Sequence, residues 1–416
     1  MSPLPESSVL YRAPWVVPVV KPPIVDGAVL CAGGRIVAVG RASRLQQEFG
    51  DVDVQDCDGV LLPGLVNAHC HLELSYLDQV ARPLATETMC DWIAALLAER
   101  ARQHDFGAAP AAARQMLREQ HAAGVALLLD IGNDESCLAG FSLPGLERVF
   151  LLECLAPTEK AQENVLARVA RLPDDLLTTA HALYSTRPEV LQALKERADR
   201  LGHCFSLHLA ESVDEIMFLG GEKSCFTDFM AERGAGDFPL PVATMRQAGV
   251  TAVLAEMGLL AENLLCVHGV HLSEPDLVRL AQVRASICLC PGSNRFLRVG
   301  RAPLAQMLGL GLLPALGTDS ITSNESLDLW QEMRIVREDH PETDPATVLA
   351  MATMAGARAM GRADDYGSLA PGQRAQILQV MSPDLCRATR ATELIDILTG
   401  TGRPETISWL SGNPQS

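Results

Sequence analysis

From Gly59 to about residue 350, short apolar runs alternate with segments whose apolar residues recur at helical spacing. The apolar runs include VALLLDIGN, RVFLLECLA, LLTTAHALYS, SICLCPGSN and LLPALGTDS, whose lengths are typical of buried strands. The helical segments between them include PAAARQMLREQHAAG, TEKAQENVLARVARL, RPEVLQALKERADRLG and SEPDLVRLAQVRA. Strand–helix alternation at this frequency predicts a parallel α/β barrel.

The two ends of the chain have a different pattern. Residues 9 to about 58 alternate apolar and turn residues, and VDGAVLCAGGRIVAVG predicts two strands. Their junction is Gly33-Gly34, because glycine accepts the positive φ of a tight hairpin turn. Near the C-terminus, the helical segment DPATVLAMATMAGARAMG leads into GSLAPGQRAQILQVM, which predicts a turn followed by a strand.

Composition favours a soluble protein. The chain has 416 residues, of which 48% are hydrophobic, enough for a large core. A formal net charge of −17 argues against nucleic acid or an anionic membrane as a partner. Twelve cysteines are too dilute for a disulfide scaffold, and Cys154, Cys266 and Cys288 lie in apolar runs, which suits reduced thiols. Because the N-terminus does not read as a signal peptide and no apolar run approaches ~18 residues, we expect a cytoplasmic protein.

Candidate chemistry stands at the C-terminal ends of four apolar runs, VLLPGLVNA, HCFSL, NLLCV and LLPALGT. The residues are His69 and His71 in NAHCHLELS, His208 with Glu211 in SLHLAES, His268 in CVHGVHL, and Asp319 in ALGTDS. A (β/α)₈ barrel brings the C-terminal ends of all its strands to one face. Three histidines and an aspartate there predict a site for Zn²⁺ or Fe²⁺ with a position open to water. This combination indicates a hydrolytic metalloenzyme.

The local spacing suggests how these groups act. His69 and His71 alternate along a strand, so their imidazoles share one face while the thiol of Cys70 points away. A chelating pair is the preferred interpretation, and two core histidines are the alternative. Glu211 follows His208 by three residues, where a carboxylate can take a proton from metal-bound water and return it to a ring nitrogen. A negative charge at a helix N-terminus is the alternative role for Glu211.

Taken in order, these motifs resemble the amidohydrolase superfamily, in the branch of cytosine, guanine and adenosine-derivative deaminases and triazine chlorohydrolases. The segments that carry the resemblance are GAVLCAGGRIVAVG, PGLVNAHCHLE, HLAES, CPGSN, GTDSITSN and GSLAPGQRAQILQV. One departure is Gln376, where the family usually has aspartate. The resemblance implies a (β/α)₈ TIM barrel over residues 59–360, beside a small β-sandwich built from residues 1–58 and 361–416.

The resemblance also implies roles for individual residues. The expected metal ligands are His69, His71, His208 and Asp319, and the expected catalytic residues are Glu211, His268 and Asp319. The fourth predicted strand, in TTAHALYS, lacks the lysine or glutamate that bridges two metals in binuclear members, so we expect one ion, Zn²⁺ before Fe²⁺. Candidate substrate contacts are His181 for a purine, Asp91 for ribose hydroxyls, and Glu73, Asn294 and Ser320 at the pocket. For His181, Asn294 and Ser320, a purely structural role is the alternative.

The expected function is hydrolytic deamination of an aromatic N-heterocycle. Metal-bound hydroxide attacks the carbon that bears the amino group, Glu211 protonates the adjacent ring nitrogen, and Asp319 helps ammonia leave. The sequence HLELS favours 6-amino-6-deoxyfutalosine as substrate, ahead of methylthioadenosine and S-adenosylhomocysteine. One alternative is a chlorohydrolase or a guanine, cytosine or other amidine hydrolase, and another is a non-catalytic scaffold. Family relatives are often dimers or larger assemblies, so we expect a homo-oligomer. The expected partner is a small heterocyclic substrate.

Overall fold

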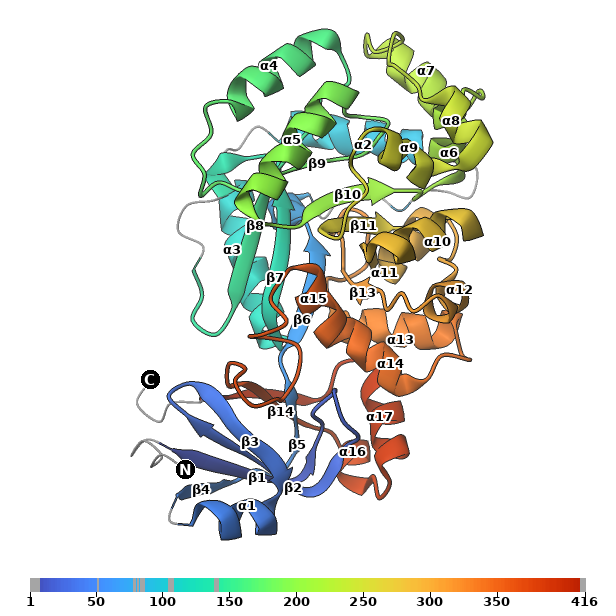
Figure 1. Ribbon diagram of the computed structural model, residues 1–416. Coiled ribbons are helices and arrows are strands. Elements are labelled where there is room, and N and C mark those ends of the chain that lie inside the picture. The colour runs from blue at the N-terminus through green and yellow to red at the C-terminus, as the bar shows by residue number, and fades with distance from the viewer. Residues whose placement is uncertain are drawn as a thin grey trace.

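The computed structural model of the chain describes residues 8–50, 52–77, 80, 82, 87–103, 108–137 and 142–411. Figure 1 shows a larger part of alternating strands and helices above a smaller β-rich part, where both chain ends lie. The strands are β1 (Val9–Val16), β2 (Ile24–Ala32), β3 (Arg35–Arg41), β4 (Asp53–Asp56), β5 (Val60–Pro63), β6 (Leu65–Cys70), β7 (Val125–Gly132), β8 (Glu147–Cys154), β9 (Thr178–Ala180), β10 (Phe205–Leu209), β11 (Leu264–His268), β12 (Ser286–Leu289), β13 (Ala315–Leu316), β14 (Gln376–Met381) and β15 (Thr406–Ser411).

Helices occupy most of the segments between the strands. The α-helices are α1 (Ala42–Phe49), α2 (Met89–Arg102), α3 (Ala108–Ala122), α4 (Glu159–Val169), α5 (Pro188–Leu201), α6 (Val213–Leu219), α7 (Cys225–Glu232), α8 (Val242–Ala248), α9 (Val250–Glu256), α10 (Glu274–Val283), α11 (Pro291–Leu297), α12 (Leu304–Gly309), α13 (Leu329–Asp339), α14 (Pro345–Ala350), α15 (Gly356–Ala359), α16 (Pro383–Arg387) and α17 (Ala391–Gly400). Short 3₁₀ turns are η1 (Leu72–Tyr76) and η2 (Glu135–Cys137), and η3 (Met351–Ala355) is a π-helical turn. The four helices predicted between strands correspond to α3, α4, α5 and α10.

The larger part is a barrel-like α/β unit. Its strands form two four-stranded sheets, in the orders β6-β7-β8-β9 and β10-β11-β12-β13. Both sheets are parallel throughout. An isolated parallel bridge between Cys70 and Asp319 joins one pair of sheet edges, and a bridge between Ala182 and His208 joins the other. The eight strands therefore direct their C-terminal ends to one face, with helices on the outer side (Figure 1).

Three predicted strands differ from the structure. The run VLLPGLVNA is divided at Gly64 into β5, which pairs in the terminal sheet, and β6, which begins the barrel-like unit. A Cβ atom at Gly64 would lie 2.4 Å from the Cβ of Ala126, so this crossing requires glycine. The run LLTTAHALYS contributes only Thr178–Ala180 as strand. The CPGSN segment starts a helix, because Pro291 suits the first helical position.

Both ends of the chain meet in a seven-stranded mixed sheet. β14 pairs antiparallel with β5, and Ile377 packs with Tyr11 and Leu61 in one buried cluster. The strand at residues 376–381 therefore shares a sheet and a buried cluster with the N-terminal strands.

The hairpin between β2 and β3 turns at the predicted glycines. Gly33 and Gly34 have φ angles of 56° and 73°, in the left-handed region that glycine accepts without strain. The two-layered sandwich and the domain boundaries at residues 58 and 360 stay predictions. β5, which belongs to the terminal sheet by its hydrogen bonds, begins just after the first of these boundaries.

The cysteines are mostly free and buried, as expected for Cys154, Cys266 and Cys288. The exception is a disulfide between Cys90 and Cys225, which joins α2 to α7. The sequence gives no signal for this pair, because its members are 135 residues apart.

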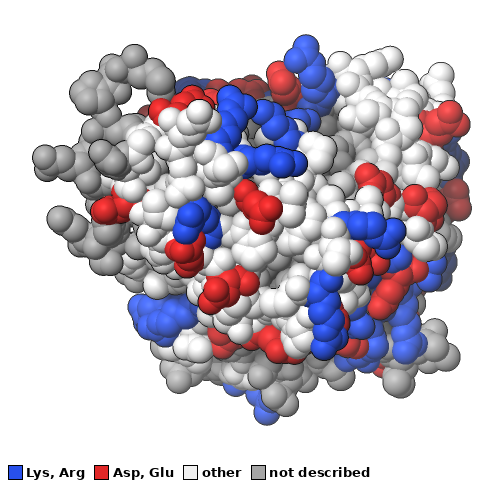
Figure 2. All heavy atoms as spheres, turned by 90° about the horizontal axis from the view of Figure 1, so that it is seen from below, with Lys and Arg blue, Asp and Glu red and all other residues white. Residues whose placement is uncertain are grey.

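Surface charges of both signs are mixed. On the face shown in Figure 2, Lys and Arg side chains are interspersed with Asp and Glu. No helix within the described ranges combines the length and the apolar character needed to cross a membrane.

Candidate active site

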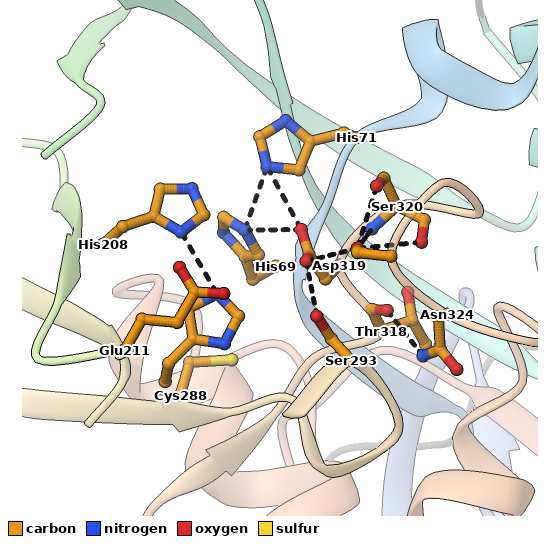
Figure 3. A network of polar contacts seen from close by, with 12 residues as sticks. His69, His71, His208, Glu211, Cys288, Ser293, Thr318, Asp319, Ser320 and Asn324 are labelled. Carbon is orange, nitrogen blue, oxygen red and sulfur yellow. Dashed lines mark hydrogen bonds and ion pairs between the residues drawn. The ribbon is translucent and has the colours of Figure 1, made fainter. Parts of the chain in front are cut away.

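The predicted site residues converge at the C-terminal end of the barrel strands (Figure 3). His69 lies in β6 and His71 directly follows it, His208 lies in β10, His268 ends β11, and Asp319 follows β13. All of these side chains are buried. The fold therefore brings together groups that are up to 250 positions apart in the sequence.

The backbone turns sharply where the strands end. Ala210, His268 and Asp319 have φ angles of 53°, 72° and 57°, which are uncommon for residues with a Cβ atom. Such conformations persist only where the surrounding structure holds them, and they concentrate at functional sites. Here they occur at the ends of β10, β11 and β13, three strands of one sheet.

Three imidazoles and a carboxylate form the centre. The Nε2 atoms of His69 and His71 are 3.1 Å apart. Oδ1 of Asp319 lies 3.6 Å from Nε2 of His69 and 3.4 Å from Nε2 of His71. The candidate ligand atoms of His69, His71 and His208 all lie within 4.8 Å of one another. One ion can therefore contact all of them after small side-chain adjustments.

The chemistry of this donor set fits a divalent metal. Burial lowers the pKa of His69 to about 4, and burial together with the neighbouring imidazoles holds the pKa of His208 well below its usual range. Both rings are therefore neutral at physiological pH and offer lone pairs. Among the described residues, Nδ1 of His69 and Nε2 of His208 are buried without a hydrogen-bond partner. Imidazole and carboxylate donors of this kind suit Zn²⁺ or Fe²⁺.

Asp319 is oriented by hydroxyl groups. Oγ of Ser293 and Oγ of Ser323 donate to its Oδ2 at 2.8 and 2.5 Å, which leaves Oδ1 facing the histidines. Burial acts to raise the pKa of Asp319, but the nearby side chains of His69, His71 and His268 outweigh it and hold the pKa well below its usual range. Asp319 is therefore ionised at neutral pH and can bind a cation.

Glu211 lies beside His208, on the side of His69 away from Asp319 (Figure 3). Its Oε1 is 3.6 Å from Nε2 of His268. Burial raises the pKa of Glu211 well above its usual range, and the charge of Asp319 adds to this effect. A raised pKa makes Glu211 a better proton acceptor at neutral pH than an exposed carboxylate. This matches the proton-carrying role expected from its spacing.

A second carboxylate, missed in the sequence, holds the segment that carries Glu211. Glu215 accepts hydrogen bonds from the backbone N–H groups of Ala210 and Glu211 at 3.0 and 2.8 Å. Its own N–H donates to Oγ of Ser212 at 3.2 Å. The Ser-x-x-Glu spacing at 212–215 is a capping-box pattern, and that signal indicates a helix start directly after Glu211.

His268 is positioned by Asn294. Its Nδ1 lies 3.0 Å from Oδ1 of Asn294, and its Nε2 lies 3.1 Å from Nδ1 of His208 and 3.6 Å from Oε1 of Glu211. Because Oδ1 of Asn294 can only accept, Nδ1 of His268 carries the proton and Nε2 presents a lone pair. Asn294 was predicted as a substrate contact. The structure instead places it behind His268, outside the cavity lining.

A cavity of about 270 Å³ opens over the centre. His181 and Ser320 line it, in agreement with their predicted places at the pocket. Its outer wall is apolar and comes largely from α2 and α7, including Met89, Trp92 and Phe229. Glu153, at the end of β8, also lines the cavity, although nothing in its apolar run pointed to a functional group. The cavity therefore joins a polar end to an apolar mouth.

Two other predicted substrate contacts do not line this cavity. Glu73 is buried, but its Oε2 accepts from the N–H groups of Asn133 and Asp134, both at 2.8 Å, and its Oε1 pairs with Arg100 at 3.3 Å. Asp91 caps α2, where it forms a capping box with Thr88. Its carboxylate is exposed, so the structure gives Asp91 a role in helix initiation.

A model of the amidohydrolase family matches residues 60–388. The chain belongs to the amidohydrolase family. Curated relatives are similar over most of their length. The chain is 30% identical over 381 residues to a 5-methylthioadenosine/S-adenosylhomocysteine deaminase of Syntrophobacter fumaroxidans, with 85% of this chain and 80% of the relative covered. It is 27% identical over 382 residues to a deaminase of the same name from Symbiobacterium thermophilum, with 85% and 80% covered.

Solved structures share the fold of this family member. An adenosine deaminase of Xanthomonas campestris with bound zinc superimposes with a TM-score of 0.78 at 24% identity, over 98% of this chain and 92% of that one. Aminofutalosine deaminase of Helicobacter pylori gives a TM-score of 0.79 at 21% identity, over 98% and 99%. Family membership and the histidine cluster together indicate a metal-dependent enzyme.

Proposed function

We propose that the chain is a hydrolytic deaminase that replaces the exocyclic amino group of an adenosine derivative with oxygen and releases ammonia. The observation that carries this proposal is the buried set of His69, His71, His208, Glu211 and Asp319, open to a cavity of about 270 Å³. The names of the curated relatives support 5-methylthioadenosine and S-adenosylhomocysteine as substrates. The aminofutalosine deaminase neighbour supports 6-amino-6-deoxyfutalosine.

We assign the metal to His69, His71, His208 and Asp319. Zn²⁺ held by such ligands acts as a Lewis acid and lowers the pKa of bound water towards ~7. The fourth barrel strand, β9, and residues 181–185 after it carry no lysine or glutamate that would bridge a second ion, which supports one ion per chain. Elemental analysis of the active enzyme should find about one equivalent of zinc or iron. Two equivalents, or activity that survives complete chelation, would contradict this assignment.

The protein groups then account for the proton transfers. Glu211, with its raised pKa, accepts a proton from the attacking water and gives it to the ring nitrogen beside the reacting carbon. His268, held by Asn294, presents its Nε2 lone pair 3.6 Å from Oε1 of Glu211 and helps to orient the water. Asp319 is ionised in the resting site. It would take the second proton of the attacking water and pass it to the departing amino group, so that ammonia leaves. Water and the amine substrate thus give a carbonyl product and ammonia.

We also propose that the eight barrel strands form one closed barrel and that the two chain ends form one small domain. Two bridges between the sheet edges support one closed (β/α)₈ barrel. The shared terminal sheet supports a small domain built from residues 1–58 and 361–416.

A deamination screen tests the function. Ammonia release and the absorbance change from adenine to hypoxanthine are measured for the three adenosine derivatives, for guanine and cytosine, and for chlorotriazines with a chloride assay. We expect ammonia from at least one adenosine derivative. Chloride release or ammonia only from free bases would favour another hydrolase of the family, and metal-loaded protein without turnover would favour a scaffold.

A further inference from the structure

Glu153 is a buried carboxylate that the proposed mechanism does not use. It lies near the end of β8, is only 5% exposed and lines the cavity. Its Oε2 accepts a hydrogen bond from Nδ2 of Asn133 at 3.0 Å. Its Oε1 is buried and has no hydrogen-bond partner among the residues that the structure describes. The nearest ring nitrogen, Nε2 of His208, is 3.8 Å away, beyond hydrogen-bonding distance.

An acceptor oxygen in this position calls for a donor from outside the chain. A carboxylate can only accept hydrogen bonds when it is ionised. Leaving such an oxygen buried and unpaired is costly, so buried carboxylate oxygens are nearly always paired. Because Glu153 faces the cavity, a bound substrate can supply the missing donor.

Glu153 lies beside His181 and His208, and one carboxylate oxygen and one ring nitrogen of each histidine lie within 4.8 Å of one another. His208 presents Nδ1 to His268 at 3.1 Å and Nε2 towards Glu153 at 3.8 Å. Glu153 therefore lies on the far side of this ring from His268. A group there is suited to hold the substrate rather than to move protons at the reacting carbon.

We propose that Glu153 determines specificity by accepting a hydrogen bond from a sugar hydroxyl of the substrate, an inference that rests on the proposed function. The donors that the three candidate adenosine derivatives share are the amino group and the sugar hydroxyls. The amino group belongs at the reacting end, beside Asp319. A hydroxyl is therefore the donor that remains for Glu153.

Asp91, first considered for the ribose hydroxyls, and Glu73, first considered for the pocket, have oxygens engaged elsewhere. Asp91 lies outside the cavity, and its Oδ2 accepts from N and Oγ1 of Thr88, both at 2.8 Å. Glu73 is held by two backbone N–H groups and by Arg100. Glu153 is a cavity carboxylate with an open oxygen, and the proposed proton transfers do not use it.

The test compares wild type with Glu153→Gln on a deaminated adenosine derivative and on its 2′-deoxy and 3′-deoxy analogues. Glutamine keeps the size of the side chain and can still offer an oxygen to Asn133, but it presents an NH₂ group where the open acceptor was. We expect kcat/KM for the hydroxylated substrate to fall roughly 10- to 100-fold, the range for a hydrogen bond to a charged group. The variant should no longer distinguish that substrate from the analogue whose hydroxyl Glu153 binds.

Metal content and Asp91→Asn provide the controls. Glu153→Gln should retain the wild-type metal content, and Asp91→Asn should retain the discrimination between the substrate and its deoxy analogues. Loss of metal in Glu153→Gln would make Glu153 a ligand and overturn the inference. Unchanged discrimination in Glu153→Gln would overturn it too, while leaving the deaminase assignment intact. A wild-type enzyme that deaminates none of the nucleosides overturns the proposed function, and this inference with it.

Discussion

His208 lies in β10 and Glu211 follows it by three residues, just after the strand. Their substitutions should impair the enzyme in different ways. Glu211→Gln keeps the size and packing of the side chain but removes the proton acceptor. Metal content should therefore persist while kcat falls by ~10²–10⁴-fold, nearer the upper limit because Glu211 handles two proton transfers. His208→Ala removes a ligand, so metal and activity should be lost together. Retention of more than about a tenth of the activity in Glu211→Gln would limit Glu211 to a helix-start charge.

Glu332 gives a residue-scale prediction for stability. It lies in α13, and its carboxylate accepts from N of Gly292 at 2.7 Å and from Nδ2 of Asn324 at 2.8 Å. Burial raises the pKa of Glu332 to about 8 in spite of these two hydrogen bonds, which lower it. Between about pH 4.3, the ordinary glutamate value, and about pH 8, the unfolded chain has lost this proton while the folded chain keeps it. The free energy of unfolding should therefore decrease as pH rises through this window.

Denaturant unfolding at about pH 5.5 and about pH 8 measures that decrease. Glu332→Gln should be less stable overall, because its NH₂ group replaces one of the two acceptors. Its stability should nevertheless decrease less between the two pH values than that of the wild type. Equal decreases in both proteins would show that Glu332 does not keep its proton in the folded state.

At the scale of elements, the disulfide between Cys90 and Cys225 connects two helices that form the apolar wall of the cavity. A cross-link between residues 135 positions apart restricts the unfolded chain, so its loss should cost about 2–4 kcal/mol. The double variant Cys90→Ser/Cys225→Ser should therefore have a lower Tm and a higher KM. Cys386→Ser is the matched control, because Cys386 is free and exposed. Equal Tm values for both variants would contradict a stabilising disulfide.

At the scale of the whole molecule, the barrel-like part depends on a sheet made by both chain ends. Deleting residues 1–50 removes β1, β2 and β3. The deletion leaves the hydrogen-bonding edge of β5 unpaired and the buried side chain of Ile377 exposed. Unpaired edges and exposed apolar faces promote aggregation. We expect an insoluble product, measured by sedimentation and size-exclusion chromatography. A soluble and fully active deletion variant would show that the terminal sheet is dispensable.

A milder pair of substitutions tests the same dependence without truncation. Ile377→Ala should cost about 2–5 kcal/mol, because Ile377 is fully buried. Gln379→Ala, on the same strand but only partly buried, should change stability by about 0.5 kcal/mol or less. Similar losses for the two would argue against a shared core.

Much of this architecture follows from local patterns in the chain. Strand and helix periods reflect burial on one side of an element, so the hairpin at Gly33-Gly34 and most of the strands could be predicted. His69 and His71 could be paired because strand geometry places alternate residues on one face. The order of the remaining ligands could be interpreted because parallel barrel strands end on one face.

Other features depend on contacts between segments far apart in the sequence. Asp91 and Glu73 carry carboxylates, as substrate-binding acids do. In the structure, however, these carboxylates accept hydrogen bonds from neighbouring groups of the chain. Glu153 lies in an apolar run of the sequence. Only the folded structure places one of its carboxylate oxygens in a hydrogen bond with Asn133 and the other 3.8 Å from Nε2 of His208. Hydrogen-bond satisfaction, cavity lining and the disulfide are properties of three-dimensional packing, and hydrophobic periodicity carries no information about them.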